Sequence, residues 1–380
     1  MVAQELNRDL IGLRGGRLLL QTPALVIDLD IMERNIARMA EHARRQGIAL
    51  RPHAKTHKCS EIARRQMEAG APGICTAKLG EAEALADARI DSILITSPVV
   101  TDRGMARLAA LNLRLSELMV VCDNAETAAR LNAAAAGSGK ALKVLVDIDP
   151  GMGRTGIAPG DPAMALAEQV ANARHLEYAG LQCYAGNLQH LESPNERREA
   201  SFSVMKRLAQ LRDALNARGL EPRILSGGGT GTFDIDPDAR TLTELQVGSY
   251  VFMDRQYNEV WQKPDNRVPF ETSLFVQTAI ISANRDGLVT TDAGFKAFAT
   301  DAGTPLIVSG APEGANYFFF GDEQGGVLYD SITQKLKPGD VLTCVVPHCD
   351  PTVNLYDCYH ALRGDQLEAI WPIEARGRAA

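Results

Sequence analysis

The sequence lacks the features that would place this chain on nucleic acid or in a membrane. No dense run of lysine and arginine occurs in its 380 residues, and the formal net charge is −7, which argues against a nucleic-acid-binding surface. No stretch approaches the roughly 20 apolar residues that a membrane span needs. The segment from Met1 to Arg8 is polar and charged, unlike the apolar core of a secretory signal. We therefore expect neither nucleic-acid nor membrane partners.

Paired cysteines are also missing. The seven cysteines are scattered along the chain, and none forms a C-x-x-C pair. An odd, dispersed set indicates reduced thiols and not a disulfide framework. The contents of hydrophobic residues (45%) and charged residues (23%) are ordinary for a globular protein. We expect a cytoplasmic location.

The main feature of the chain is an alternation of short apolar runs and helical patterns. Eight apolar runs indicate strands, and segments of helical period separate most of them. Strands that alternate with helical crossovers predict an α/β fold, here a (β/α)8 TIM-type barrel. A doubly wound open sheet is the alternative, but its glycine-rich loop is missing after the first strand. The eight predicted strands are 48–53, 73–76, 92–96, 118–122, 142–148, 178–183, 223–225 and 244–248.

The pattern changes near residue 265, with the boundary at about 261–267. Helical periodicity ends there, and β-type runs separated by glycine, aspartate and asparagine turns predict a second, mostly antiparallel β domain. An early strand at 24–28 precedes the barrel and could join this domain. We therefore expect a barrel over residues 30–262 and a β domain from residues 1–29 plus 263–380. The later strands are expected at 273–281, 287–291, 317–320, 326–329, 341–346 and 369–372.

A lysine lies between two histidines in Arg51-Pro-His-Ala-Lys-Thr-His-Lys58, directly after the first predicted barrel strand. Barrel enzymes place their functional residues at the carboxyl ends of the strands. A partly desolvated lysine near other cationic groups loses its proton more easily and can form a Schiff base. A solvated basic turn is the alternative. The position predicts an amine nucleophile at Lys55.

A glycine run, Ser226-Gly-Gly-Gly-Thr-Gly-Thr232, follows the seventh predicted strand. Successive glycines let backbone N–H groups approach a phosphate, and a threonine hydroxyl could add a donor. Barrels often bind phosphate beyond strands seven and eight, so Gly248-Ser-Tyr250 would complete the site. A flexible loop is the alternative interpretation.

Three polar residues follow the fifth and sixth predicted strands. Arg154, in a glycine-containing loop, could be a permanently protonated donor to a ring nitrogen or an anion. Tyr184 and His190 come later, and His190 could act as a general base. A surface arginine and a solvated histidine are the alternatives.

The predicted β domain contains a His-x-Asp pair in Pro347-His-Cys-Asp-Pro351. In extended backbone the side chains of His348 and Asp350 would point to one side and Cys349 to the other. An imidazole and a carboxylate suit a divalent cation of the Mn, Mg or Zn kind, with water or substrate in the remaining positions. We expect a metal site at His348 and Asp350.

Together these motifs resemble the D-threonine aldolase family, the metal-activated branch of the alanine-racemase-like (fold type III) pyridoxal-phosphate enzymes. The resemblance extends from about residue 22 to residue 377. It implies pyridoxal phosphate and a divalent metal as cofactors, and cleavage of a small D-β-hydroxy amino acid of the D-threonine or D-3-hydroxyaspartate type to glycine and an aldehyde. Its motifs are Arg51-Pro-His-Ala-Lys55, Gly227-Gly-Gly-Thr-Gly231, Glu244-Leu-Gln-Val-Gly-Ser-Tyr250 with Met253-Asp254, Asp292-Ala-Gly294, and His348-Cys-Asp-Pro-Thr352.

The resemblance also implies roles for single residues. Lys55 would bind the cofactor as a Schiff base, and Arg154 would meet its pyridine nitrogen. His190 would lie beside the substrate's β-hydroxyl, and His348 and Asp350 would hold the metal. Related barrels often pair, so a homodimer is implied as an option. The implied cofactor-binding set is His53, Lys55, Arg154, Tyr184, Gly228, Gly229, Thr230, Gly248, Ser249 and Tyr250.

The chain departs from the family pattern at positions expected near the substrate, which leaves the preferred β-hydroxy amino acid open. A metal-activated dehydratase of D-serine or 3-hydroxy-D-aspartate would use the same cofactors. A racemase is a further alternative, but it would have no evident use for a metal at the His-x-Asp pair. A noncatalytic pyridoxal-phosphate carrier is another, but it would not explain the second domain. The departures are Ser97-Pro98 for Asn-Glu, Ala77-Lys78 for Gln-Lys, Asp322-Glu-Gln-Gly325 for Asp-Glu-His-Gly, and Ala185 for histidine.

Overall fold

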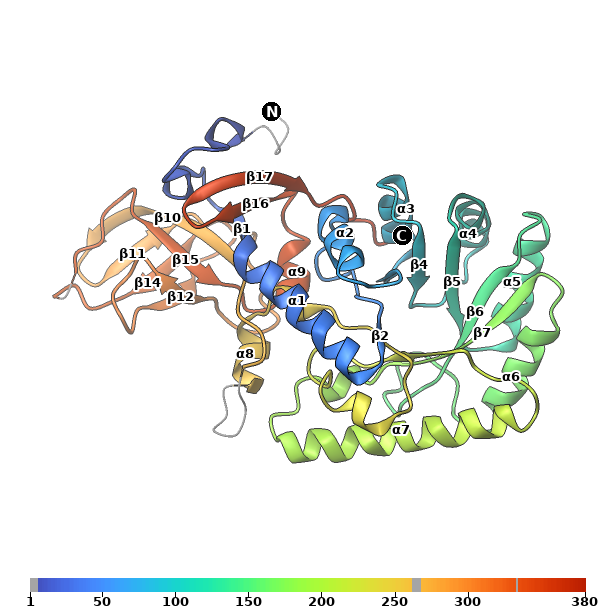
Figure 1. Cartoon of the computed structure of the whole chain (residues 1–380). Coiled ribbons are helices and arrows are strands. Elements are labelled where there is room, and N and C mark those ends of the chain that lie inside the picture. The colour runs from blue at the N-terminus through green and yellow to red at the C-terminus, as the bar shows by residue number, and fades with distance from the viewer. Residues whose placement is uncertain (1–5, 262–267, 333) are drawn as a thin grey trace. The chain divides into compact units, whose positions relative to one another are not determined.

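The computed structural model describes residues 6–261, 268–332 and 334–380, and the chain divides into two compact units (Figure 1). The barrel unit contains Arg38–Lys55, Ser60–Gly248 and Gly377–Ala380. The β unit contains Met1–Ala37, Thr56–Cys59 and Ser249–Arg376. Of the boundary predicted at 261–267, residues 262–267 lie outside the described part of the chain.

The barrel unit is built on one sheet of eight parallel strands, and each contains part of one predicted run. An isolated parallel bridge between His53 and Cys75 joins the two ends of this sheet. There the Cys75 amide donates to Pro52 O at 2.8 Å, and the Ala54 amide donates to Cys75 O at 2.8 Å. The prediction of a TIM-type barrel is thereby confirmed. In sheet order the strands are β2 (Ala49–Leu50), β9 (Glu244–Leu245), β8 (Ile224–Gly227), β7 (Leu176–Cys183), β6 (Leu142–Asp147), β5 (Glu117–Cys122), β4 (Ser92–Ile95) and β3 (Ile74–Thr76).

Helices connect most of these strands, and side-chain caps fix where three of them begin. Thr101, Asn124 and Ser193 each accept a hydrogen bond from a backbone amide in the first turn of the helix that follows. The strand side chains are buried because helices cover the sheet, so the runs are apolar without alternation. The helices are α1 (Leu29–Gln46), α2 (Ser60–Glu68), α3 (Leu79–Asp87), α4 (Asp102–Arg114), α5 (Ala125–Ala136), α6 (Asp161–Asn172) and α7 (Pro194–Asn216).

The β unit contains a mixed, mostly antiparallel sheet. Its strand β1 (Ala24–Asp28) pairs antiparallel with β10 (Leu274–Arg285) and parallel with β16 (Cys358–Arg363), so the early strand joins this sheet as predicted. The sequence patterns did not predict β12 (Leu306–Ser309) or β16, because neither shows a clear alternation of buried and exposed residues. The other strands are β11 (Leu288–Thr291), β13 (Asn316–Phe319), β14 (Gly325–Leu328), β15 (Val341–Val345) and β17 (Gln366–Pro372), and the short helices are α8 (Arg255–Trp261) and α9 (Cys349–Val353).

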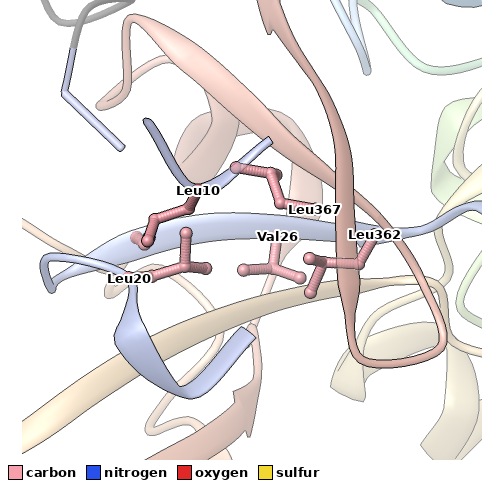
Figure 2. Packing of buried hydrophobic residues seen from close by; sticks show 6 residues of the cluster. Leu10, Leu20, Val26, Leu362 and Leu367 are labelled. Atoms are coloured by element: carbon pink, nitrogen blue, oxygen red, sulfur yellow. The ribbon is translucent and has the colours of Figure 1, made fainter. Parts of the chain in front are cut away.

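An apolar cluster fixes the N-terminal segment onto this sheet (Figure 2). Leu10 and Leu20 point toward Val26 of β1, and Leu362 and Leu367 come from the β16–β17 hairpin. All five side chains are buried, and burying one leucine stabilises a fold by about 1.5–3 kcal/mol. Leu10 and Leu20 are therefore part of the β unit's core. No helix in the described ranges is long and apolar enough to cross a membrane.

Candidate active site

Lys55 follows β2 in a turn that His53 holds in place. The His53 amide donates to Val247 O at 2.9 Å, and its ring nitrogen Nε2 lies 3.0 Å from Thr96 Oγ1. The other ring nitrogen, Nδ1, accepts from the backbone amide of Lys55 at 3.3 Å. His53 is only 8% exposed, so the ring acts as a fixed support for the turn that presents Lys55.

Lys55 lies in the wall of a cavity of about 180 Å³ in the barrel unit. Arg154 and Tyr184 line the same cavity, and the guanidinium carbon of Arg154 lies 5.5 Å from the centre of the Tyr184 ring. Four of the residues predicted from the sequence are thus brought together, and Ala77 and Ser97, two departures from the family pattern, lie beside them. The lining residues are His53, Lys55, Ala77, Thr96, Ser97, Arg154, Thr155, Gln182, Tyr184 and Gln246.

A buried carboxyl group, Asp147 at the end of β6, supports the floor of this cavity. It accepts hydrogen bonds from Thr155 Oγ1 at 2.8 Å and from Gln182 Nε2 at 2.9 Å. Burial raises the pKa of Asp147 to about 6, although both hydrogen bonds and the charge of Arg154 act in the opposite direction. Asp147 therefore holds two residues of the cavity wall, and the sequence analysis did not identify it.

A buried polar chain continues from this floor through the barrel interior. Gln246 Nε2 donates to Gln182 Oε1 at 3.0 Å and to Ser226 Oγ at 2.8 Å. Ser226 Oγ donates to Glu244 at 2.7 Å, and Arg51 Nε lies 3.0 Å from both Glu244 oxygens. Arg51 and Glu244, which begin two of the family motifs, therefore form a buried ion pair inside the barrel.

The glycine run after β8 is a packed turn. A Cβ atom at Gly227 would collide with the carbonyl oxygen of Cys183, and one at Gly231 would collide with that of Gln189. Gly228 has a φ of +69°, which favours glycine. Gly229 and Thr230 are buried. These contacts explain why the turn needs glycine, and its role in binding phosphate stays a prediction.

The second predicted phosphate-binding segment, Gly248-Ser-Tyr250, contains residues of different units. Gly248 belongs to the barrel unit, whereas Ser249 and Tyr250 belong to the β unit. Ser249 is 7% exposed and Tyr250 is 1% exposed, and the Tyr250 ring packs edge-on against Phe270 with ring centres 5.6 Å apart. Both residues are therefore buried in the β unit, and their contact with phosphate stays a prediction.

His190 lies in the loop between β7 and α7, and its side chain is partly buried. It is not among the described residues that line the cavity around Lys55. Its neighbour in the chain, Gln189, is 2% exposed and packs against the glycine turn. The role of His190 as a general base stays a prediction.

The backbone at the His-x-Asp pair differs from the expected strand. His348 is extended, with φ −143° and ψ 125°, but Asp350 lies in the first turn of α9, so the strand expectation is wrong for Asp350. The reason is Pro351, which is tolerated in the first turn of a helix because an amide there needs no intrahelical partner. Cys349 is fully buried and donates its amide to Asp254 at 2.9 Å, in keeping with a structural role.

A carboxylate that the sequence analysis missed contacts His348. Asp301 Oδ2 lies 2.6 Å from His348 Nδ1. When an Nδ1–H donates to a carboxylate, the lone pair is left on Nε2, and this is how metal-binding histidines are usually oriented. The residue lies 47 positions before His348 and belongs to no recognisable spacing, so no local signal could have identified it.

A larger, open hollow of about 500 Å³ lies on the β unit. None of its described lining residues is a lysine that could form a Schiff base with a cofactor. The lining residues are Ser282, Asn284, Arg285, Leu288, Thr290, Phe320 and Gln324.

Comparisons with known proteins agree with this geometry. Residues 27–256 match the family model for the alanine racemase N-terminal domain, and residues 273–362 match a putative serine dehydratase domain. The chain is 39% identical to a D-threonine aldolase of Arthrobacter sp. over 94% of its own length and 93% of the relative's. It is 35% identical to a 3-hydroxy-D-aspartate aldolase of Paracoccus denitrificans over the same shares.

A solved structure extends the similarity to the whole fold. The D-threonine aldolase from Filomicrobium marinum superposes with a TM-score of 0.91 at 38% sequence identity, covering 96% of this chain and 97% of that one. The similarity thus extends over both units. The chain belongs to the D-threonine and 3-hydroxy-D-aspartate aldolase family of alanine-racemase-like fold type III enzymes.

Proposed function

We propose that this chain is a pyridoxal-phosphate- and divalent-metal-dependent aldolase that cleaves D-β-hydroxy-α-amino acids of the D-threonine or D-3-hydroxyaspartate type to glycine and an aldehyde. The observation that carries the proposal is the presence of Lys55 and Arg154 in the wall of one cavity at the carboxyl ends of the barrel strands. Two relatives that match 94% of the chain, at 35% and 39% identity, are named as aldolases. Both lines of support point to the same reaction class.

The residues present fit pyridoxal phosphate. Lys55 would supply the amine that holds the cofactor's aldehyde carbon, and Arg154 would donate to the ring nitrogen. The turn at Gly228–Thr230, together with Gly248–Tyr250, would offer backbone N–H groups to the phosphate. A Cβ atom at Gly227 or Gly231 would collide with the backbone carbonyl oxygen of Cys183 or Gln189, so the turn keeps its shape only with glycine at these two positions. When bound, the cofactor would withdraw electrons from the substrate's Cα.

Arg154 also bears on the kind of chemistry. A guanidinium keeps its proton, so Arg154 would donate to the ring nitrogen without protonating it. Electron withdrawal through the ring is then weaker, so additional activation of the substrate at its β-oxygen becomes useful. This favours cleavage of a β-hydroxy amino acid, in which that oxygen takes part, over simple loss of the α-proton.

His348 and Asp350 would hold the metal, and Asp301 would orient the His348 imidazole so that Nε2 faces the ion. The described residues contain no group of three or more histidine, cysteine, aspartate or glutamate side chains placed to hold a metal ion. Water and the substrate's oxygen would therefore complete the coordination, which leaves open positions as catalytic metals require. The metal, when bound, would lower the pKa of the substrate hydroxyl.

His190 would accept the proton of the β-hydroxyl, directly or through one water molecule. As the β-oxygen becomes a carbonyl, the Cα–Cβ bond breaks and its electron pair stays on Cα. The aldehyde leaves, and a proton delivered to Cα completes glycine. Atoms and charges balance without an oxidant or reductant.

A product assay tests the proposal. The purified chain, with pyridoxal phosphate and Mn²⁺, is given D-threonine, D-threo-3-hydroxyaspartate and D-serine separately, and glycine, carbonyl products, keto acid and ammonia are quantified. Glycine with an equal amount of aldehyde or glyoxylate supports the aldolase and identifies its substrate. The absence of glycine with every substrate would refute it.

The second candidate is a metal-activated dehydratase, which the match of residues 273–362 to a putative serine dehydratase domain favours. A dehydratase would remove the α-proton and expel the β-hydroxyl, yielding a keto acid and ammonia. The same assay distinguishes the two reactions. A chain that binds cofactor but yields no product would instead support the carrier or racemase alternatives.

A further inference from the structure

The side-chain amide of Gln189 connects two loops at the carboxyl end of the barrel. Gln189 is 2% exposed and directly precedes His190. Its Oε1 accepts from the Gly231 amide at 2.8 Å, and its Nε2 donates to Ala185 O at 3.2 Å and to Thr232 Oγ1 at 3.1 Å. One side chain therefore ties the loop after β7 to the glycine turn after β8.

Gln189 also fills the space that the glycines leave. A Cβ atom at Gly229 would collide with the Gln189 side-chain amide, and one at Gly231 would collide with the Gln189 backbone. The two glycines and the glutamine are thus fitted to each other. Moving the glutamine side chain would change the packing against the backbone N–H groups of the turn.

A buried carboxyl group, Asp236, fixes the direction of the amide. Thr232 Oγ1 donates to Asp236 Oδ2 at 2.6 Å, and Ser201 Oγ of α7 donates to Asp236 Oδ1 at 2.5 Å. Because the Thr232 hydroxyl gives its hydrogen to Asp236, it can only accept from Gln189. A flipped amide would place its NH₂ group against the Gly231 N–H and its oxygen against Ala185 O. Only one orientation satisfies all the partners.

We propose that Gln189 is a positioning residue with two effects. It fixes the conformation of the glycine turn, which would bind the cofactor phosphate, and it fixes the position of the adjoining His190 relative to that turn. This inference rests on the proposed function, because it assigns the phosphate to the turn and the proton transfer to His190. It predicts that one substitution will weaken recognition of the phosphate and slow turnover through His190. It also predicts that contacts with the cofactor ring will be unaffected.

The test compares two ligands that differ only in the phosphate. Apoprotein is titrated with pyridoxal phosphate and with pyridoxal, and the dissociation constant of each is measured by absorbance. Gln189→Met keeps the length of the side chain and removes three hydrogen bonds. We expect its dissociation constant for pyridoxal phosphate to rise about tenfold or more, because each buried bond contributes on the order of 1 kcal/mol. The constant for pyridoxal should change less than about twofold.

Two further variants make the result specific. Gln189→Glu keeps the acceptor for the Gly231 amide and removes both donors, so it should show the same phosphate-selective loss and serves if Gln189→Met does not fold. Gln169→Met is the matched control: Gln169 donates to Ala125 O at 2.9 Å, on α6, and is outside the proposed site. It should leave both dissociation constants unchanged.

The second arm measures turnover of D-threonine at saturating cofactor. Gln189→Met should lower kcat, and in a His190→Ala background it should lower kcat no further, since the two residues act through one proton transfer. Equal weakening of both ligands, or additive losses of kcat, would overturn the inference while leaving the aldolase proposal intact. If the unaltered protein bound no pyridoxal phosphate, the proposed function itself would fail.

Discussion

The buried pair of Arg51 and Glu244 allows a quantitative test of the barrel interior. The side chains are 4% and 5% exposed, and Arg51 Nε lies 3.0 Å from a Glu244 carboxylate oxygen. Removing one partner leaves the other charge buried without compensation, which costs about 3–5 kcal/mol. We therefore expect Arg51→Met to lower the free energy of unfolding by about that amount.

The double variant Arg51→Met, Glu244→Leu separates two effects: the loss of the ion pair itself, and the cost of leaving one buried charge without its partner. Replacing both ions with apolar side chains of similar volume is often neutral or stabilising. The double variant should therefore recover most of the stability lost in Arg51→Met. Urea unfolding, followed by tryptophan fluorescence and circular dichroism, gives the midpoints for the original chain, both single variants and the double variant.

A single-variant loss below about 1 kcal/mol would refute the reasoning, since surface pairs have values in that range. A double variant that is less stable than Arg51→Met would also contradict it. Glu244 accepts from Ser226 as well, so some loss from that hydroxyl will remain in the double variant.

Four further predictions concern the site. Lys55→Ala should abolish the visible absorbance of the bound cofactor, and retention of that band would mean that another lysine is used. Asp301→Asn should weaken binding of Mn²⁺, measured by calorimetry, by about 10–100-fold, and His348→Ala with Asp350→Ala should remove metal-dependent activity; unchanged activity in chelator would refute the metal site. Burial raises the pKa of Asp147 from 3.8 to about 6, so the fold favours its protonated form. This contribution to stability is therefore greatest at low pH and falls by about 3 kcal/mol as the pH rises from about 4 to 6. The stability difference between the original chain and Asp147→Asn, from urea unfolding at several pH values, should follow this curve, and a pH-independent difference would contradict it.

The sequence predicted what depends on local pattern. Lys55 and Arg154 were identified because each follows a barrel strand in a recognisable motif, and the barrel itself follows from the alternation of strands and helices. Asp301 and Gln189 were missed because their importance comes from contacts with residues far away in the chain. The side-chain direction of Asp350 was worked out for extended backbone, whereas Asp350 lies in the first turn of α9.

Ser249 and Tyr250 show a second kind of information that the sequence motifs do not contain. Their motif was recognised in the sequence, but nothing in it indicated that these two residues pack within the β unit, whereas Gly248 belongs to the barrel unit. Membership of a unit depends on packing against many residues far away in the chain, and a local spacing does not encode it.

The place of β1 in its sheet has a consequence for how the chain is made. This strand is synthesised before the barrel, yet both of its hydrogen-bonding neighbours, β10 and β16, follow the barrel in the sequence (Figure 1). Its side chains from Ala24 to Ile27 are apolar and buried in the finished fold. During synthesis the edge of β1 that pairs with β16 stays open until residue 363 has emerged, so a stalled or truncated chain presents an aggregation-prone strand edge. Fragments that begin after β1 would lack a strand from the interior of the sheet.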